Sequence, residues 1–518
     1  MPDITAVIPG FTGQVITAGH DRYDEVRSIW NGMHDRRPAV IARCGNTADV
    51  AAAIAYARYY DLVIAVRGGG HSLPGFSTCE GGLVVDLRPM NKVTVDPAAR
   101  VATVQGGALL GDLDRAAQDH GLVVPAGVIS HTGVAGLTLG GGVGRLMRRF
   151  GLTIDSLRSA EVVTADGRVL RAEQDRHSDL FWALRGGGGN FGVVTEFEFA
   201  LHELPARALT VLSCYHDLAD AHRVLRLAEQ VMSAEPADEL LWTSFARKAP
   251  PRPWLPAGLA GRPGIMSVIE WSGDQRPGQD DGYRLLSELR AELRPSASDL
   301  GVIPFGQIQS EGDEFFGAGL RSYVKATFAD ELTDELTDVV SARGALIGSE
   351  VSQIELLSMG GAIRRVPPDA TPFPHRTASW LVNIPASWRS GAQTEREIGW
   401  VRDTYAALTP YCRGGGYVNF MDGDEQAAGH AAYGATLRRL QAVKAAYDPG
   451  NVFRLNQNII PLSPDTAPDG QVTPSGASSA QPCGSVPHSP CCSCAAGVSA
   501  PWCRMVMTPR PACRRRTA

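Results

Sequence analysis

Clusters of glycine constrain the fold of this chain more than any other feature of its sequence. Four clusters are present, and they are Gly68–Gly70, Gly140–Gly142 with Gly144, Gly186–Gly189 with Gly192, and Gly414–Gly416. Because glycine loses much backbone entropy on folding, such clusters mark backbone that must turn sharply or approach a ligand closely. The first cluster follows the apolar residues 62–66 and precedes a lone histidine, His71.

The residues after the clusters argue against a Rossmann dinucleotide site. That site needs a strand, a glycine turn and then a helix, because the helix N-terminus binds the pyrophosphate. Here Gly68–Gly70 leads to the strand-like residues 81–88, and Gly186–Gly189 leads to another strand-like run. We therefore interpret the clusters as strand-to-strand loops whose backbone N–H groups surround an extended, phosphate-bearing cofactor. Glycine-rich turns without a ligand are the alternative.

His71 has two interpretations. A lone histidine is more often structural than functional. This one follows a glycine turn, where a neutral imidazole nitrogen held by rigid backbone could attack an electrophilic carbon of a cofactor.

The alternation of strand-like and helix-like segments, and the changes in glycine content along the chain, predict an α+β fold with several domains. Residues 1–34 form an N-terminal extension, and residues 35–205 alternate short strands with helices and glycine loops. Residues 206–410 form a second α+β domain. The glycine-rich character returns in residues 411–462, and residues 463–518 form a Pro/Ser/Cys-rich tail that we expect to be disordered. Local signals include Asn46 or Thr47 as a helix cap and Asp166-Gly167 as a hairpin turn.

Composition excludes several partners. The net charge of −6 argues against nucleic acid, and the N-terminus lacks the pattern of a secretory signal. No apolar run reaches the length of a membrane span, so a cytoplasmic location is expected. The four cysteines of the body do not suggest a disulfide framework, and no metal site is expected. A metal at Cys491, Cys492, Cys494 and His488 is a weak alternative to a disordered tail.

Four ordered segments resemble one family. They are residues 37–72, 131–157, 179–199 and 447–459, which include "RGGGHS", "HTGVAGLTLGGG", "RGGGGNFGVV" and "YDPGNVFRLNQNI". The chain resembles the FAD-linked oxidases of the berberine-bridge-enzyme type, and within them the bacterial 6-hydroxy-D-nicotine oxidase group and oxidases of secondary metabolism. The resemblance implies a two-lobed FAD-binding domain of the vanillyl-alcohol-oxidase (PCMH) type and a substrate domain with an antiparallel sheet. The C-terminal segment would return to the FAD domain.

The resemblance also implies which residues bind FAD. "RGGGHS" would hold the pyrophosphate, and His71 would carry a covalent 8α-histidyl bond to the flavin. Many members add a second link through a cysteine, but Ile129 stands in its place here, so a single link is expected. Thr132 matches a residue that controls oxygen access, Val193 an adenine contact, and Asn456 with Asn458 a segment covering the isoalloxazine. The implied cofactor-binding set is Arg67, Gly68, Gly69, Gly70, His71, Ser72, Ser130, Thr132, Gly133, Gly136, Gly140, Gly142, Gly144, Val193, Asn456 and Asn458.

The expected activity is transfer of hydride from a C–H bond of a small alcohol or amine to flavin N5, followed by reoxidation by dioxygen to give hydrogen peroxide. A dehydrogenase with another acceptor, or a flavin-binding protein with little catalysis, stays open. Tyr417 is the candidate base or orienting group, with a packed strand tyrosine as the alternative. Lys325, His375 and Arg376 are candidate substrate contacts. The sequence does not indicate the substrate or the oligomeric state.

Overall fold

The computed structural model describes residues 7–273, 281–423 and 426–463. All of them fall in one compact unit, which spans residues 1–476. The fold is α+β, as expected, and it contains four sheets. The expected disordered tail and its cysteine cluster lie outside the described residues.

The first sheet carries the first glycine loop. Its four strands run in the order β1-β2-β4-β3. They are β1 (Gln14–Ile16), β2 (Val40–Arg43), β4 (Leu83–Asp86) and β3 (Ile64–Arg67). Strands β2 and β3 both pair with β4 in parallel. Strand β1 pairs with β2 in the antiparallel sense, so the segment before residue 35 contributes a strand to this sheet rather than standing apart from it.

The helix of this sheet forms for the reason expected from the sequence. Helix α2 (Thr47–Tyr59) begins where the Asn46 side chain accepts a hydrogen bond from the backbone N–H of Asp49. Its alanines and Ile54 pack on β2 and β4 in an apolar core. A capping side chain and a core-facing apolar stripe are sufficient to define such a helix.

The second sheet has five antiparallel strands in the order β5-β6-β10-β8-β9. They are β5 (Val93–Asp96), β6 (Val101–Gln105), β10 (Val193–Ala200), β8 (Leu157–Val163) and β9 (Val169–Glu173). Gly167, at a φ of 84°, closes the expected β8–β9 hairpin. Two short strands, β7 (Leu122–Val123) and β11 (His202–Glu203), pair beside it.

The third large sheet belongs to the middle of the chain. Its seven antiparallel strands run in the order β15-β12-β14-β13-β17-β18-β16. They are β15 (Ala297–Pro304), β12 (Ala208–Asp217), β14 (Pro263–Trp271), β13 (Leu240–Lys248), β17 (Gln353–Ser358), β18 (Trp380–Trp388) and β16 (Arg321–Ala329). The expected antiparallel sheet is therefore present.

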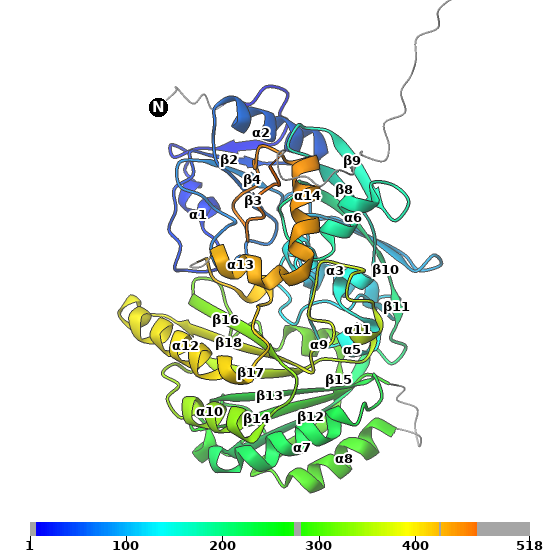
Figure 1. Cartoon of the computed structure of the whole chain (residues 1–518), viewed down its shortest axis with the longest axis vertical. Coiled ribbons are helices and arrows are strands. Elements are labelled where there is room, and N and C mark those ends of the chain that lie inside the picture. Colours follow the sequence, from blue (N-terminus) through cyan, green and yellow to red (C-terminus); the bar gives the residue numbers. More distant parts are fainter. Residues whose placement is uncertain (1–6, 274–280, 424–425, 464–518) are drawn as a thin grey trace, which may run out of the picture. The chain divides into compact units, whose positions relative to one another are not determined.

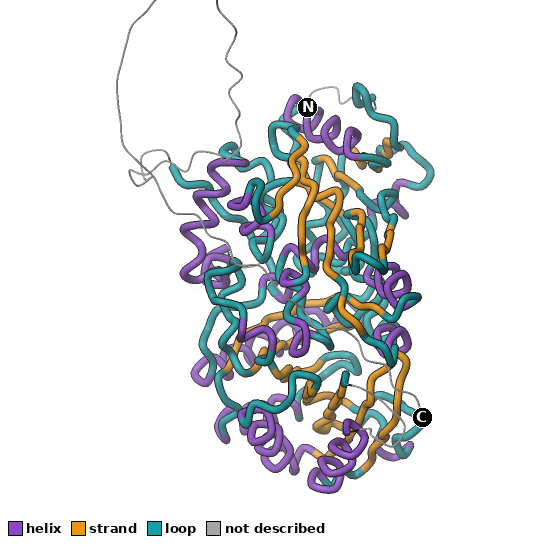
Figure 2. The backbone as a smooth tube through the Cα atoms, turned by 90° about the vertical axis from the view of Figure 1, so that its right-hand side faces the viewer, coloured by secondary structure: helices purple, strands orange, loops and turns teal. Residues whose placement is uncertain are grey.

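Four helices cover one face of the seven-stranded sheet. They are α7 (Ala221–Ser233), α8 (Asp281–Leu293), α10 (Asp334–Gly344) and α12 (Thr394–Leu408). Alternate strand residues such as Trp242, Leu356 and Trp380 pack against these helices in the largest core cluster. Figure 1 shows α7, α8 and α10 together along the lower edge of the view, and Figure 2 shows helices outside the strands there from a second direction. Since side chains alternate along a strand, the opposite face is left for other contacts.

The remaining helices are short or lie near the C-terminus. The α-helices are α1 (Tyr23–Arg27), α3 (Leu110–Gln118), α4 (Val134–Leu139), α5 (Met147–Phe150), α6 (Ser178–Leu184), α9 (Phe305–Ser310), α11 (Ala362–Arg365), α13 (Gln426–Tyr433) and α14 (Leu437–Tyr447). The 3-10 turns are Thr153–Asp155, Leu218–Asp220, Ala257–Leu259, Gly391–Gln393, Thr409–Tyr411, Val418–Phe420 and Gly434–Thr436. No helix within the described ranges has the length and apolar character needed to cross a bilayer.

Three of the four glycine clusters differ from the expectation of strand-to-strand loops, since Gly414–Gly416 lies between the 3-10 turns Thr409–Tyr411 and Val418–Phe420. Gly68–Gly70 does join two strands, β3 and β4. However, Gly140–Gly144 lies between α4 and α5, and Gly186–Gly189 lies between α6 and β10. Short helices therefore end at these glycines, as glycine at a helix C-terminus commonly permits.

A buried lysine of the C-terminal segment, Lys444, binds the loop that precedes β10 of the second sheet. Helix α14 packs on α6. The Nζ of Lys444 donates to the carbonyl oxygens of Asn190 and Phe453, at 2.7 Å and 2.9 Å, and to Oδ2 of Asp448 at 2.6 Å. Both side chains of this ion pair are fully buried.

Replacing Lys444 by methionine should be strongly destabilising. The Lys444→Met change leaves the Asp448 carboxylate buried without its cation, which costs about 3–5 kcal/mol of unfolding free energy. Denaturant unfolding measures this loss. Lys92 is exposed, so Lys92→Met is the matched control and should change stability by less than about 0.5 kcal/mol. Equal midpoints for the two variants would contradict the prediction.

Candidate functional site

A large cavity lies between the glycine loops and the free face of the seven-stranded sheet. Its volume is about 550 Å³. Residues of all three parts of the fold line it: the glycine loops with His71, the sheet strands β12, β13, β14, β16, β17 and β18, and the C-terminal residues Leu455, Asn456 and Gln457. Segments far apart in the sequence thus meet around one space.

The glycines of this cavity allow two loops to touch. A Cβ on Gly69 would lie 2.4 Å from the backbone nitrogen of Gly133, and a Cβ on Gly133 would lie 2.3 Å from that of Gly69. Gly70 has a φ of 76°, a backbone angle that residues with a side chain rarely adopt. The glycines are therefore required for the close approach of the backbone at this edge of the cavity.

Other glycines leave open space that a ligand could fill. Gly136 and Gly189 both line the cavity, and an ideal Cβ on either would meet nothing within 4 Å. Asn456 also lines it: its Nδ2 donates to the carbonyls of Gly189 and Phe453, while its buried Oδ1 has no hydrogen-bond partner among the described residues. Open backbone and an unsatisfied polar atom fit an extended polar cofactor such as FAD.

Filling that open space should impair cofactor binding without harming the fold. Gly136 lies inside α4, so Gly136→Leu suits the helix but places a side chain in the cavity. Overpacking of about 1–3 kcal/mol lowers FAD affinity roughly 10- to 100-fold, as measured by equilibrium titration of apoprotein in a His71→Ala background, where FAD binding is reversible. Gly399→Leu is the control, since Gly399 lies in α12 outside the cavity lining with nothing near its Cβ position. Unchanged FAD affinity in Gly136→Leu would contradict the assignment.

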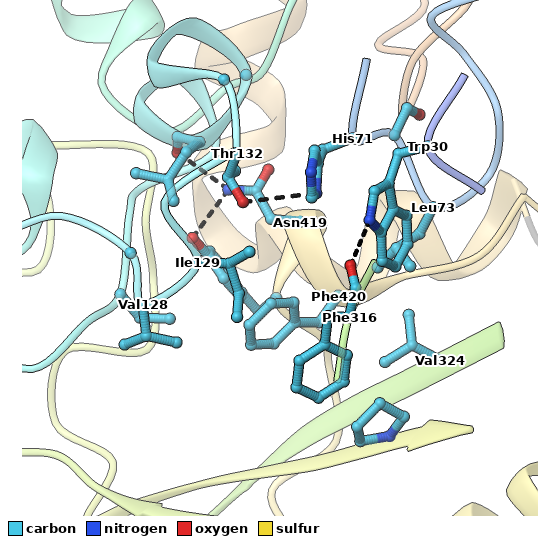
Figure 3. A pocket seen from close by; sticks show the side chains of 18 of the residues that line it. Trp30, His71, Leu73, Val128, Ile129, Thr132, Phe316, Val324, Asn419 and Phe420 are labelled. Carbon is cyan, nitrogen blue, oxygen red and sulfur yellow. Dashed lines mark hydrogen bonds between the residues drawn. The ribbon is translucent and has the colours of Figure 1, made fainter. Parts of the chain in front are cut away.

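His71 lines the cavity from the loop after β3 (Figure 3). Its ring stacks on Trp30, with centroids 4.8 Å apart and planes at 21°. Its Nε2 shares a hydrogen bond of 2.6 Å with Nδ1 of His131, and its Nδ1 lies 3.5 Å from Oγ1 of Thr132. Burial, and then the neighbouring His131, lower the pKa of His71 to about 3. The imidazole is therefore neutral at physiological pH, which is the nucleophilic form.

The ring of His131 is in turn placed by an acidic residue of the middle domain. Asp313 accepts hydrogen bonds from both the backbone N–H and the hydroxyl of Ser130. Its Oδ1 lies 4.0 Å from Nε2 of His131. The same segment reaches the histidine pair on the other side, because the carbonyl of Phe316 accepts the indole N–H of Trp30 at 2.7 Å. Trp30, His131 and Asp313 were not predicted as site residues from the sequence, because their contacts depend on tertiary packing.

Tyr417 lines the cavity, but its hydroxyl is already engaged. The oxygen accepts a hydrogen bond from the backbone N–H of Gly142 at 2.9 Å and another from Nδ2 of Asn419 at 2.8 Å. Burial raises the pKa of Tyr417 to about 12. A phenol with this pKa stays protonated at neutral pH and cannot act as a base. Its two hydrogen bonds favour a role in orienting the groups around it.

The three candidate substrate contacts lie outside the cavity lining, which corrects that expectation. Lys325 points toward the helix-covered face, where its ammonium lies over the Tyr405 ring and 3.7 Å from Asp422. His375 stacks on Phe328 at 4.0 Å, and burial lowers its pKa to about 4.

Arg376 is likewise removed from the cavity lining. It is fully buried and forms an ion pair with Asp155 at 2.7 Å. Its guanidinium also donates to the hydroxyl of Thr371. Arg376 therefore binds the turn at residues 153–155 and is not placed to contact a ligand in the cavity.

The residues implied for the cofactor fall into two groups. Those in the cavity lining are Gly68, Gly69, Gly70, His71, Ser72, Thr132, Gly133, Gly136, Gly144, Val193 and Asn456. Arg67, Ser130, Gly140, Gly142 and Asn458 are not part of the lining. Arg67, for example, donates to the carbonyls of Val26, Arg27 and Ser77, and so fixes the base of the loop instead of facing a pyrophosphate.

The wall opposite the glycine loops contains two carboxyl groups, those of Glu355 and Glu270. Glu355 on β17 accepts a hydrogen bond of 2.9 Å from Nδ2 of Asn383 on β18, its cross-strand neighbour. Burial raises the pKa of Glu355 above its usual value. Glu270 on β14 forms an ion pair with Arg145 from the α4–α5 connection. Glu355 and Glu270 could have been found from the sequence, because each is a charged residue within an otherwise apolar strand.

Comparisons with known proteins agree with this arrangement. A family model described as an FAD binding domain matches residues 38–173, and one described as berberine and berberine like matches residues 416–460. (R)-6-hydroxynicotine oxidase of Paenarthrobacter nicotinovorans is 33% identical over 467 residues, covering 87% of this chain and 97% of that protein. The FAD-linked oxidoreductase hasG of Aspergillus fumigatus is 42% identical over 468 residues, covering 85% and 95%.

A solved structure has the same fold. The crystal structure of 6-hydroxy-D-nicotine oxidase from Arthrobacter nicotinovorans matches with a TM-score of 0.75 and 29% identity. The match covers 87% of this chain and 98% of that one. The similarity therefore extends over nearly all the described residues, and the earlier resemblance is confirmed.

Proposed function

Because the chain belongs to the berberine-bridge-like family of FAD-linked oxidoreductases, we propose that it oxidises a small alcohol or amine at a C–H bond. When bound, FAD supplies the hydride acceptor at N5 and the route of electrons to dioxygen, which yields hydrogen peroxide. The observation that carries the proposal is the cavity itself. It has glycine loops and a neutral His71 along one wall and a buried carboxyl group on the other.

We also propose that His71 forms the covalent bond to the flavin, and that Nδ1 is the bonding atom. Its Nε2 is held by His131 at 2.6 Å, whereas its Nδ1 makes the longer contact of 3.5 Å with the Thr132 hydroxyl, so Nδ1 is the more available nitrogen. Stacking on Trp30 fixes the ring plane. Ile129 lines the cavity where a second link would need a cysteine, which supports a single link.

For an alcohol substrate, Glu355 is the group best placed to take the O–H proton. Its carboxyl lines the cavity, has a raised pKa, and is oriented by the hydrogen bond from Asn383. Glu270 is less available, because its carboxylate is already paired with Arg145. An amine substrate with a neutral nitrogen needs no such base. Tyr417 and Asn419 would hold the glycine turn at residues 140–142 against the cavity.

Turnover experiments test the proposal. Purified protein should be yellow and contain one FAD per chain, and substrate should bleach the flavin under anaerobic conditions. Admission of air should restore the colour and release one hydrogen peroxide per substrate oxidised. Reoxidation only by an added dye would establish a dehydrogenase, and a colourless protein that does not take up FAD would refute the proposal.

A further inference from the structure

Arg247 presents an unused cationic donor to the cavity. It lies near the end of β13, on the cavity face of the sheet. Its Nε donates to the carbonyl of Lys248 at 3.3 Å, but its buried Nη2 has no hydrogen-bond partner among the residues that the structure describes. Burial, and then the nearby Arg252, lower the pKa of Arg247 to about 10, so it remains charged at neutral pH. A buried charge without a partner is costly, which indicates a missing ligand group.

The neighbouring charges do not neutralise Arg247. Both Arg247 and Arg252 lie over the ring of Phe315, at 5.7 Å and 5.0 Å from its centroid. Arg252 has an acidic partner, Glu311, at 3.0 Å. Glu355 attracts Arg247 electrostatically, but among the described residues no ion pair joins the two, so only Arg252 has a direct counter-ion. A single negative charge brought by a ligand would supply the other.

The residues beside Arg247 offer hydrogen-bond acceptors. Gln353 is its direct cross-strand partner, and Glu355 is the next residue on the same face of β17. The side-chain oxygens Oε1 of Gln353 and Oδ1 of Asn383 are buried and without partners in the described part of the chain. Diagonal neighbours across two strands lie roughly 7–8 Å apart, which is the span of a small organic molecule.

The rest of this wall is apolar. Phe245, Met266, Val268, Leu357 and Trp254 line it together with Phe315. Glu270 and Glu355 lie on the same face, so a doubly charged anion such as a phosphate ester would meet two acidic groups. A planar group with one charge suits a single guanidinium better, because it can accept two parallel hydrogen bonds.

We propose that the substrate is an apolar or aromatic hydroxy acid or amino acid. Its carboxylate binds the guanidinium of Arg247, and its hydroxyl or amino group faces Asn383 and Glu355. This inference rests on the function proposed above and adds the substrate class. It assigns Arg247 a role in specificity that is separate from the flavin contacts on the opposite wall.

Binding of a matched pair of probes to the holoenzyme tests the inference. Calorimetry with 3-phenylpropionate and with 3-phenylpropionamide compares a carboxylate with a neutral group of the same shape. The wild-type protein should bind the acid at least 10-fold more tightly than the amide. Arg247→Gln should weaken acid binding about 10- to 100-fold and leave amide binding unchanged, since hydrogen bonds to a charged group are lost. Arg247→Lys should retain part of the preference.

The control is Arg262→Gln. Arg262 is exposed beside the same sheet and pairs with Asp217, so its loss should change neither affinity. Thermal midpoints and flavin content establish that each variant is folded. Equal affinity of the wild-type protein for acid and amide, or a preference that survives in Arg247→Gln, would overturn the inference. Flavin content and peroxide release judge the proposed function separately, because calorimetry does not depend on turnover.

Discussion

His71→Ala is expected to abolish acid-stable flavin. In the wild-type protein, trichloroacetic acid should precipitate a yellow pellet, because the flavin is bonded to the imidazole. In the variant the flavin should appear in the supernatant. The glycine loops that line the cavity remain, so the variant should still bind FAD reversibly, with weaker retention and slower reduction by substrate. Peptide mass spectrometry should locate the flavin on the fragment that contains residue 71, and NMR of that fragment should show the bond at Nδ1.

A half-buried histidine outside the cavity, His202, serves as the control for this change. His202 stacks on Phe150 at 4.5 Å and contacts the Ser156 hydroxyl, outside the cavity lining. His202→Ala should therefore keep its flavin in the acid pellet. Since the pKa of His71 is near 3, covalent loading of apoprotein with FAD should not fall as the pH is lowered from 8 to 5 on account of this group. Acid-stable flavin in His71→Ala would refute the tether.

Features defined by a few neighbouring residues were predictable from the sequence. The helix cap, which the structure places at Asn46, and the Gly167 hairpin both appear in the structure as expected. Each depends on contacts within about five residues, where side-chain chemistry restricts the backbone directly. The glycine turn with His71 was visible for the same reason, because glycines that permit unusual backbone are adjacent in the chain.

The partners of His71 depend on packing between distant segments. Trp30 lies before the first glycine loop, His131 lies beyond it, and Asp313 belongs to the middle of the chain. Nothing local in the sequence brings them together. It was also difficult to predict which residues of a strand face the cavity. Neighbouring residues of a strand point to opposite faces of the sheet, so an error of one position selects the wrong face. Lys325 was expected in the cavity, yet the residue before it, Val324, is the one that lines it.

Glu355→Gln is expected to reduce turnover of an alcohol substrate by about 10²- to 10⁴-fold, which is the usual contribution of a general base. The amide keeps the shape and the hydrogen bond to Asn383 but cannot accept the substrate proton. Stopped-flow measurement of anaerobic flavin bleaching isolates this step from the reaction with oxygen. Substrate affinity should change much less than the rate constant, because the charge that we assign to substrate binding belongs to Arg247.

The pH profile distinguishes a base from a merely structural carboxyl. Burial raises the pKa of Glu355, whereas Asn383, Arg145 and Arg247 oppose that shift. The base must be deprotonated to act, so the wild-type rate should fall as the pH drops through this raised pKa, above the value of about 4.3 for an ordinary glutamate. Glu355→Gln should lose that acidic limb. Glu288→Gln, an exposed change on α8, should keep both the rate and the limb. An alcohol oxidised by Glu355→Gln at more than a tenth of the wild-type rate would show that another group takes the proton.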